Sequence, residues 1–481
     1  MDQDNVCKIV PSQKGSDKIN ARGFLMVKDK NRDDLYYWCC EKRKSQMCNG
    51  RLTTIFFKGE HYIRKFTEHN HAPQASASEL AKSVGYLKED ARNTRDQPCQ
   101  IIQNNVINTS PDIRPYLPSK DALRKKIKRV RQNERPQEPK TLHEIDIPAN
   151  LRKTLTGELF LVRDSVVGNE RILTFTTAAN VEPLSQAPYW IMDGTFKTVP
   201  LIFYQLYTIH APVGTQNSRI LPLVYALMTS KSEENYKRLF QDLTDFAEEN
   251  NLQLKPARII SDLEKAAINA SKAEYPDVTN KVCFFHLCQC GWRKIQASGL
   301  ASKYGTDERF SLMLRHLFAL AFIPANEIPT AFDMLRPHLP PDAQDICQWF
   351  EENYVHGRIR RRLDNGISPR VPPLFPPTLW CVYDSIQLGV PRTQNAVEAW
   401  HRRLESLVGR AHLGVYNIIE NFQKEQEQVD AQVECILRGE QPPKRRKVDE
   451  EKEKRILTVV NDQPNRPVMD YLRGIAHNLS L

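Results

Sequence analysis

Two cysteines and two histidines near the start of the chain constrain its fold more than any other feature. Cys40 and Cys48 are followed by His69 and His71, and the residues between them form strand-like runs rich in β-branched and aromatic side chains. Two thiolates and two imidazoles make a closed tetrahedral ligand set for Zn²⁺, and His-x-His in an extended segment puts both rings on one face. A module of roughly 50 residues buries too little apolar surface to fold alone, so we predict a zinc-stapled β module.

The first ligand has a rival, because Cys39 directly precedes Cys40 and neighbouring strand side chains point in opposite directions. Over residues 15–73 the sequence resembles the FLYWCH-type zinc finger, and its pattern is supplied in order by Phe24, Leu35, Tyr37-Trp38, Cys40, Cys48 and His69-x-His71. The Trp-x-Cys of that family favours Cys40, and the resemblance implies a small DNA-binding module. The alternatives are four unrelated residues or a zinc module that binds protein.

Composition bounds the rest of the chain. A length of 481 residues indicates about three domains. The 68 Lys and Arg residues exceed the 58 Asp and Glu residues, and this basic balance permits nucleic-acid binding. The 11 cysteines are scattered rather than spaced as a disulfide framework, which favours reduced thiols inside the cell. No apolar run approaches the ~18–20 residues of a membrane span, and the N-terminus is unlike a secretory signal, so no membrane partner is expected.

A short basic run lies near the other end of the chain. Residues 444–447 follow two prolines within what we expect to be a charged tail, residues 426–481. Such runs stay extended and exposed and are typical of nuclear import signals, which predicts a nuclear protein and import receptors as partners. A solvated charge run is the alternative. The signal residues are Lys444, Arg445, Arg446 and Lys447.

Residues 74–150 are expected to form a basic helical module and a linker. One helix begins after Ser119, a suitable N-cap, and places Leu123, Ile127 and Val130 on one face. A cationic helix of this kind can lie along phosphates as part of a helix-turn-helix-like reader, or it can be an ordinary solvated helix. The predicted DNA-binding residues are Arg124, Lys125, Lys128, Arg129 and Arg131.

From about residue 155 strands and helices alternate. Strands are predicted over 189–196, 203–210, 220–228, 257–262 and 280–285, with helices over 232–250, 263–274 and from His286 onward. Three meandering strands followed by α-β-α-β-α is the RNase H-like order, a mixed sheet flanked by helices. We therefore predict an α/β RNase H-like core whose first part spans residues 155–291.

Two acids occupy strand ends in this core. Asp193 belongs to the first of these strands and Asp262 ends the fourth, and adjacent strands would bring them side by side. Facing carboxylates repel, so cations are expected between them. Hard oxygen ligands suit two Mg²⁺ or Mn²⁺ ions of the kind that catalyse phosphoryl transfer.

The motifs around these acids resemble those of Mutator-like (MULE) transposases. They are Asp193-Gly-Thr-Phe-Lys197, Ser261-Asp262-x-Glu264-Lys265-Ala266, Cys283-x-x-His286 and Asn395-Ala-Val-Glu398. The resemblance covers residues 185–410 and implies an RNase H-like DDE domain in which Asp193, Asp262 and Glu398 are catalytic, and Cys283 and His286 form a supporting element. It also implies a mainly helical insertion at 292–390 and a return to the core at 391–425.

Three points stay open at this level. Gln394 stands where the family pattern has a second Asn, which weakens the placement of Glu398 and leaves Glu405 as the reserve third acid. Cys283, His286, Cys288 and Cys290 could instead form a second zinc site, although core cysteines are the simpler interpretation. The resemblance implies a transposase that binds terminal repeats and target DNA as a homo-oligomer. The alternatives are a domesticated DNA-binding regulator without catalysis and a nuclease without strand transfer.

Overall fold

The N-terminal unit, residues 1–137, begins with a small closed β-barrel. The computed structural model describes residues 5–10, 18–94, 96–134, 137–360, 369–409, 412–444 and 446–480. Each barrel strand is antiparallel to the next, and β1 also pairs with β6 and closes the ring. The strands are β1 (Val6–Val10), β2 (Lys18–Ala21), β3 (Phe24–Arg32), β4 (Leu35–Cys40), β5 (Arg51–Phe57) and β6 (Glu60–Phe66). The barrel therefore begins one strand earlier than the predicted boundary at residue 15.

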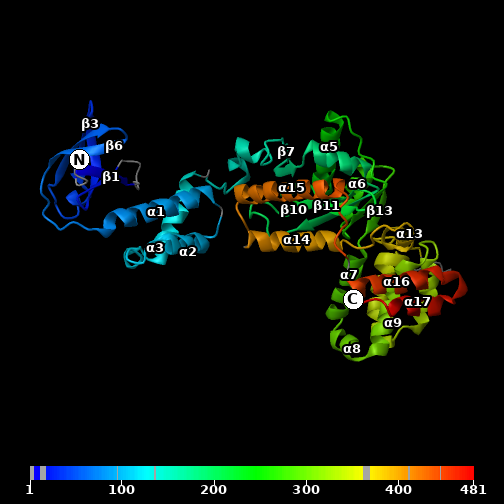
Figure 1. Cartoon of the computed structure of the whole chain (residues 1–481). Coiled ribbons are helices and arrows are strands. Elements are labelled where there is room, and N and C mark those ends of the chain that lie inside the picture. The colour runs from blue at the N-terminus through cyan, green and yellow to red at the C-terminus, as the bar shows by residue number, and fades with distance from the viewer. Residues whose placement is uncertain are drawn as a thin grey trace. The chain divides into compact units, whose positions relative to one another are not determined.

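Helices α1 (Ser76–Asn93), α2 (Pro98–Asn108) and α3 (Lys120–Glu134) follow the barrel in this unit (Figure 1). Leu123 and Ile127 of α3 pack against Leu87 and Ile101, which confirms the predicted apolar face of α3. The Oγ of Ser119 accepts a hydrogen bond from the backbone N–H of Ala122 at 3.3 Å, as an N-cap does.

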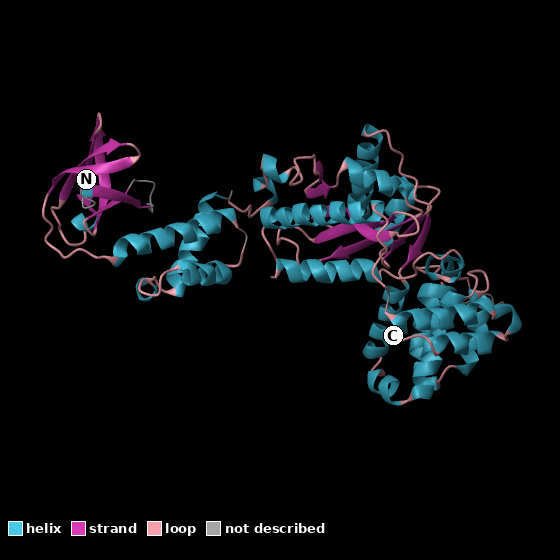
Figure 2. Cartoon of the chain, in the orientation of Figure 1, coloured by secondary structure: helices cyan, strands magenta, loops and turns pink. Residues whose placement is uncertain are grey.

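The second unit, residues 138–481, is built on a seven-stranded mixed sheet in the order β13-β12-β9-β10-β11-β8-β7 (Figure 2). The strands β9, β10 and β11 are antiparallel neighbours, whereas β12 is parallel to both β9 and β13. The strands are β7 (Leu161–Val167), β8 (Glu170–Phe175), β9 (Tyr189–Thr195), β10 (Gln205–Val213), β11 (Arg219–Met228), β12 (Arg258–Ser261) and β13 (Thr279–Val282). The hairpin β7–β8 was not predicted; the five later strands were.

Helices cover both faces of this sheet. On one face Trp190, Met192 and Tyr207 pack with α4 (Ala178–Gln186), α5 (Glu233–Glu249) and α6 (Lys265–Glu274). On the other face Leu206 and Tyr225 pack with α14 (Asn395–Val408) and the first half of α15 (Val415–Leu437). Successive residues of one strand thus contact the helices on opposite faces of the sheet. The same alternation determines which of these two faces Asp193 lies on.

The remaining helices form a separate core beside the sheet. Figure 1 shows α16 and α17 lying beside α9 in this region, and α17 packs on α9. The helices are α7 (Phe284–Ala297), α8 (Ala301–Thr306), α9 (Glu308–Ala319), α10 (Ile328–Leu335), α11 (Gln344–Phe350), α12 (Pro377–Trp380), α13 (Tyr383–Gln387), α16 (Lys447–Asn461) and α17 (Val468–Ala476). None of the helices in the described ranges is both long and apolar enough to cross a bilayer.

The expected charged tail, residues 426–481, is wrong as a structural description. Ile456, Val460, Tyr471 and Ile475 are buried in the core of the helical region together with residues of α9 and α10. These apolar positions recur at helical spacing between charges, so the segment folds as amphipathic helices against the insertion. The import run at 444–447 ends at Lys447, the first residue of α16, and Arg445 falls outside the described residues.

Candidate zinc centre and acidic site

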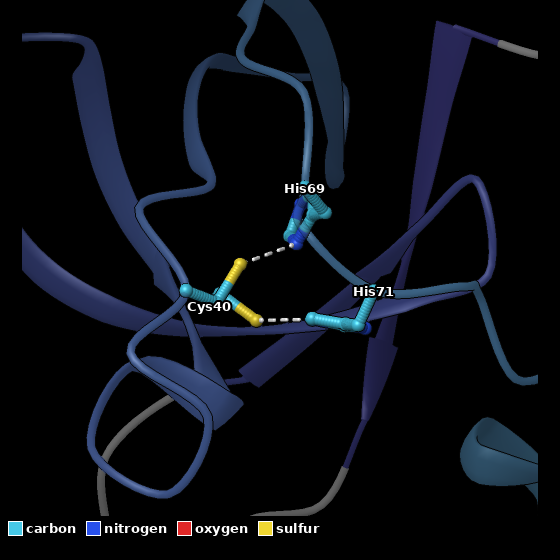
Figure 3. A group of neighbouring side chains, drawn as sticks. Cys40, His69 and His71 are labelled. Atoms are coloured by element: carbon cyan, nitrogen blue, oxygen red, sulfur yellow. Dashed lines mark hydrogen bonds between the residues drawn. The ribbon is translucent and has the colours of Figure 1, made fainter.

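The four predicted zinc ligands come together at one end of the barrel. One ligand atom from each of Cys40, Cys48, His69 and His71 lies within 4.8 Å of the other three. The Sγ of Cys40 is 3.2 Å from Nε2 of His71, and the Sγ of Cys48 is 3.3 Å from Nδ1 of His69. Figure 3 shows the sulfur of Cys40 facing the His71 ring. Two thiols and two imidazoles at this separation fit a tetrahedral Zn²⁺.

The surrounding residues explain why these four side chains meet. Cys40 is buried at the end of β4, while Cys39 is only half-buried, so alternation along the strand selects Cys40. His69 and His71 lie after β6 rather than within a strand, and the ring of Phe24 stacks on His69 at 3.8 Å between centroids. A Cβ on Gly50 would meet the His69 ring at 2.4 Å, so only glycine fits there.

The thiols of this cluster differ in acidity before metal binds. Burial, and then the neighbouring Cys48, raise the pKa of Cys40 to about 11. Burial opposes ionisation of Cys48 as well, but backbone N–H groups of Gly50 and Asn70 outweigh it and lower the pKa of that thiol. Burial lowers the pKa of His69, which keeps its ring neutral and able to ligate.

We predict that zinc affinity rises with pH. Zinc requires the Cys40 thiolate, and a group with a pKa of about 11 carries its proton throughout the neutral range, so binding must release that proton. Affinity should therefore rise by at least about tenfold per pH unit between about pH 6 and about pH 8, because any proton that Cys48 still carries is released as well. A chelator competition titration measures this slope, and an affinity independent of pH would contradict the ligand role of Cys40.

The second site lies where β9 and β12 end side by side. These parallel strands pair Ile191 with Ile260, so Asp193 and Asp262 each stand two residues beyond a paired position. Both acids therefore project from the same face as the two isoleucines. That face is the one covered by α14, because Val397 of α14 packs on Ile191 and Ile260.

The start of α14 is bonded directly to these strand ends. The side-chain Nε2 of Gln394 donates to the carbonyl of Met192 at 2.8 Å and to that of Ile260 at 3.3 Å. Its backbone N–H donates to the Sγ of Cys283 at 3.3 Å. Gln394 thus joins three strand ends and places the next helical turn, including Glu398, above them. Gln394, which stands where the family pattern has an Asn, therefore has a structural role.

Each aspartate lies beside a histidine. Nδ1 of His286 is 2.9 Å from Oδ1 of Asp262, and Nδ1 of His401 is 3.2 Å from Oδ2 of Asp193. The other oxygen of Asp193 accepts from the N–H of Gly194 at 2.8 Å. Nε2 of His401 in turn lies 3.3 Å from the hydroxyl of Thr208. His401 lies three residues after Glu398 on α14, on the same side of the helix.

The three acids influence one another electrostatically. Burial, and beyond it the neighbouring Asp193, raise the pKa of Asp262, while His286 acts against this rise. Burial also raises the pKa of Glu398, with Asp193 and Asp262 adding to the effect and His286 and Arg402 opposing it. Carboxylates that resist ionisation because of one another are sites where a cation would be stabilised.

One carboxylate oxygen supports such a cation. Oε1 of Glu398 is buried and makes no hydrogen bond with any described residue, whereas Oδ1 of Asp262 lies against the His286 ring. A buried anionic oxygen without a donor is costly unless a cation lies against it. Within the described residues only the Cys/His set brings three ligand atoms within 4.8 Å of one another, so the three acids do not form such a close group.

The reserve residues lie in other environments. Glu405 pairs with Lys197 at 3.5 Å, and none of the charge effects at Asp262 or Glu398 involves it. Cys283 and Cys288 are buried, and no described group of three ligand atoms includes them or Cys290. Cys283 instead contacts His286, where its sulfur and Asp262 overcome the effect of burial and raise the pKa of the imidazole.

The predicted DNA-binding residues of α3 divide into two groups. Four of them, Arg124, Lys125, Lys128 and Arg129, are exposed. Arg131 is engaged elsewhere in the fold, because its guanidinium donates to the backbone carbonyls of Ala91, Thr94 and Asp96 at 2.8 to 3.1 Å. These bonds satisfy the C-terminal end of α1, so Arg131 contributes to the fold of the module rather than to a free cationic face.

Two known families match the chain, each over one of these regions. Residues 9–71 match the FLYWCH zinc finger domain, and residues 189–290 match the MULE transposase domain. The chain carries a MULE transposase domain behind a FLYWCH zinc finger. No curated protein matches the chain. The MULE match includes Asp193, Asp262, Cys283 and His286, and it ends before α14 and Glu398. The FLYWCH match includes all four zinc ligands, which supports a structural zinc.

Proposed function

We propose that this chain is a DNA transposase of the Mutator-like type, which cleaves and transfers DNA strands at element ends. The observation that most supports this proposal is that Asp193 and Asp262 lie at the ends of paired strands, under the helix that bears Glu398. The MULE match over two of these acids supports this assignment. The antiparallel β9–β11 meander beside parallel β12 and β13 supports an RNase H-like core.

Asp193, Asp262 and Glu398 would hold the catalytic metal. Two Mg²⁺ or Mn²⁺ ions, when bound there, would activate a water or a 3′-hydroxyl and stabilise the leaving oxygen. The protein's own part is to orient the carboxylates: Gly194 and His401 hold Asp193, His286 holds Asp262, and Gln394 places the helix of Glu398. Such partners of metal ligands set both affinity and orientation.

The contact of His401 with Asp193 can be tested with two near-isosteric variants. Asparagine places its amide near the position of Nδ1 and can still donate to Asp193, whereas glutamine reaches the position of Nε2 near Thr208. We expect His401→Gln to weaken Mn²⁺ binding by about 10- to 100-fold, and His401→Asn to retain most of it. Mn²⁺ titration followed by electron paramagnetic resonance measures this directly. Equal losses in the two variants would remove the orienting role of His401.

The proposed activity is tested by incubating the zinc-loaded protein with DNA from the element's own termini, with and without Mg²⁺. Metal-dependent nicking at the terminus, followed by joining to a target, supports a transposase. Nicking without joining indicates a nuclease. Binding without nicking indicates a domesticated regulator whose acids no longer act. Assembly on paired ends is a further proposal, and light scattering of the protein–DNA complex tests it.

We also propose nuclear import through the run at 444–447. Lys444, Arg446 and Lys447 are exposed, as an import receptor requires. A fluorescent fusion with Lys444→Ala and Lys447→Ala should lose nuclear accumulation, and unchanged accumulation would refute the signal.

A further inference from the structure

A cavity of about 250 Å³ lies between the zinc-bearing barrel and the helices of the same unit. Its floor is apolar and includes Leu25, Leu80 and Val84. Its wall includes two of the zinc ligands, Cys40 and His71. The barrel, the ligand set and α1 therefore all contribute to a single hollow, whose lysines belong to none of the predicted sites.

The charged residues that line this cavity are mostly basic. Four lysines line it, from β2, the turn after β4, α1 and α3, and the one acid among the described residues that line it is Glu41. Glu41 is already paired with Lys18. The lining lysines are Lys18, Lys42, Lys88 and Lys126.

Lys88 is the most informative of the four. Its side chain is half-buried, and it makes no ion pair with any acid in the described ranges. Burial, and then the charges of Lys126, Arg92 and Lys18, lower its pKa. A half-buried ammonium among other cations is stabilised when an anion enters between them.

We propose that this cavity binds a backbone phosphate of duplex DNA, next to the zinc centre. Convergent lysines act as point charges for phosphate oxygens, and a hollow with apolar walls strengthens their attraction by excluding water. Lys126 of α3 lines the cavity, so the same helix carries both a cavity lysine and the exposed cations Arg124, Lys125, Lys128 and Arg129. This inference deepens the proposed function, since it rests on DNA being the partner and names where the finger unit holds it.

The site also depends on zinc. Cys40 and His71 form part of the wall, so loss of the metal would displace the lysine of β2 and the turn that carries Lys42. Two thiolates with zinc and two neutral imidazoles carry no net charge, so the metal-loaded centre does not cancel the lysines. The phosphate site is therefore expected only in the zinc-loaded protein.

The test compares Lys88→Gln with Lys82→Gln in the full-length, zinc-loaded protein. Lys82 lies on the same helix, pairs with Glu79 at 3.2 Å and does not line this cavity. Fluorescence anisotropy with a short labelled duplex, repeated over a series of salt concentrations, gives the affinity and its salt slope. Lys88→Gln should weaken binding about three- to tenfold and make the logarithmic salt slope shallower by about one. Lys88→Arg should restore both, and zinc content and circular dichroism establish that each variant is folded.

Three outcomes would overturn the proposal. Lys88→Gln and Lys82→Gln could bind DNA alike, which removes the phosphate site while leaving the transposase assignment intact. Lys88→Gln could weaken binding with an unchanged salt slope, which indicates a structural effect. Titration with inorganic phosphate could show binding that depends on Lys88 while DNA affinity does not, which makes the occupant a free phosphate. Failure of the parent protein to bind any DNA would instead refute the proposed function itself.

Discussion

Asp193→Asn should abolish metal-dependent DNA cleavage while leaving DNA binding unchanged. The substitution removes one of two carboxylates at paired strand ends, where the metal ions would otherwise contribute several kcal/mol to the transition state. Cleavage should therefore fall by about a thousandfold or more. The fold should persist, because the neutral amide relieves the repulsion that adds to the effect of burial in raising the pKa of Asp262. Cleavage of terminal-repeat DNA in Mg²⁺ and anisotropy binding measure the two properties separately.

The third acid provides the matched control for this experiment. Glu398→Gln should reproduce the loss, whereas Glu405→Gln, on the same helix and paired with Lys197, should cleave like the parent protein. Cleavage by Asp193→Asn at the parent's rate would refute the catalytic assignment. Loss in Glu405→Gln and retention in Glu398→Gln would reassign the third acid alone.

Cys48→Ser should release zinc and unfold the FLYWCH finger. Serine keeps the size of the side chain but is a far weaker zinc ligand, and structural zinc sites of this kind contribute about 10–16 kcal/mol to folding. The barrel core is small, so apolar burial alone contributes too little to keep the barrel folded without zinc. Elemental analysis should show loss of the metal, and limited proteolysis should cut within the barrel while sparing residues 138–481, which have cores of their own.

Cys39 supplies the control for the finger. It neighbours Cys40 on β4 but is not among the four clustered ligands, so Cys39→Ser should keep both zinc and protease resistance. Full zinc content in Cys48→Ser would show that the metal is held by a different set of side chains.

The apolar periodicity of the sequence predicted those strands and helices whose formation depends mainly on neighbouring residues. The strands 189–196 and 220–228 and the helix 232–250 were predicted within a few residues of β9, β11 and α5, because each carries its own apolar periodicity. The hairpin β7–β8 was missed, since its short strands have no comparable run of alternation. Charge dominates the import run and its surroundings, which predicts a tail there, although the buried residues of α16 and α17 recur at helical spacing.

Some of the candidate site residues could likewise be predicted from the sequence, and others could not. The four zinc ligands and the two aspartates could be named from residue type and spacing, because metal ligation and the ends of parallel strands restrict which side chains are useful. Arg131 was grouped with the DNA-facing cations, since nothing in its helix indicates that it caps α1. His401 could have been suspected from its position three residues after Glu398, on the same side of the helix.

The sequence by itself determined which chemistry the chain can carry: a Cys₂His₂ zinc set, two acids at strand ends, and a cationic helix. The tertiary structure alone decided which distant groups meet. It brought Gln394 to the carbonyls of Met192 and Ile260, His401 to Asp193, and the lysines of β2, α1 and α3 around one cavity. The physical reason is that periodicity records which face of an element is buried, whereas packing across hundreds of residues determines what that face is buried against.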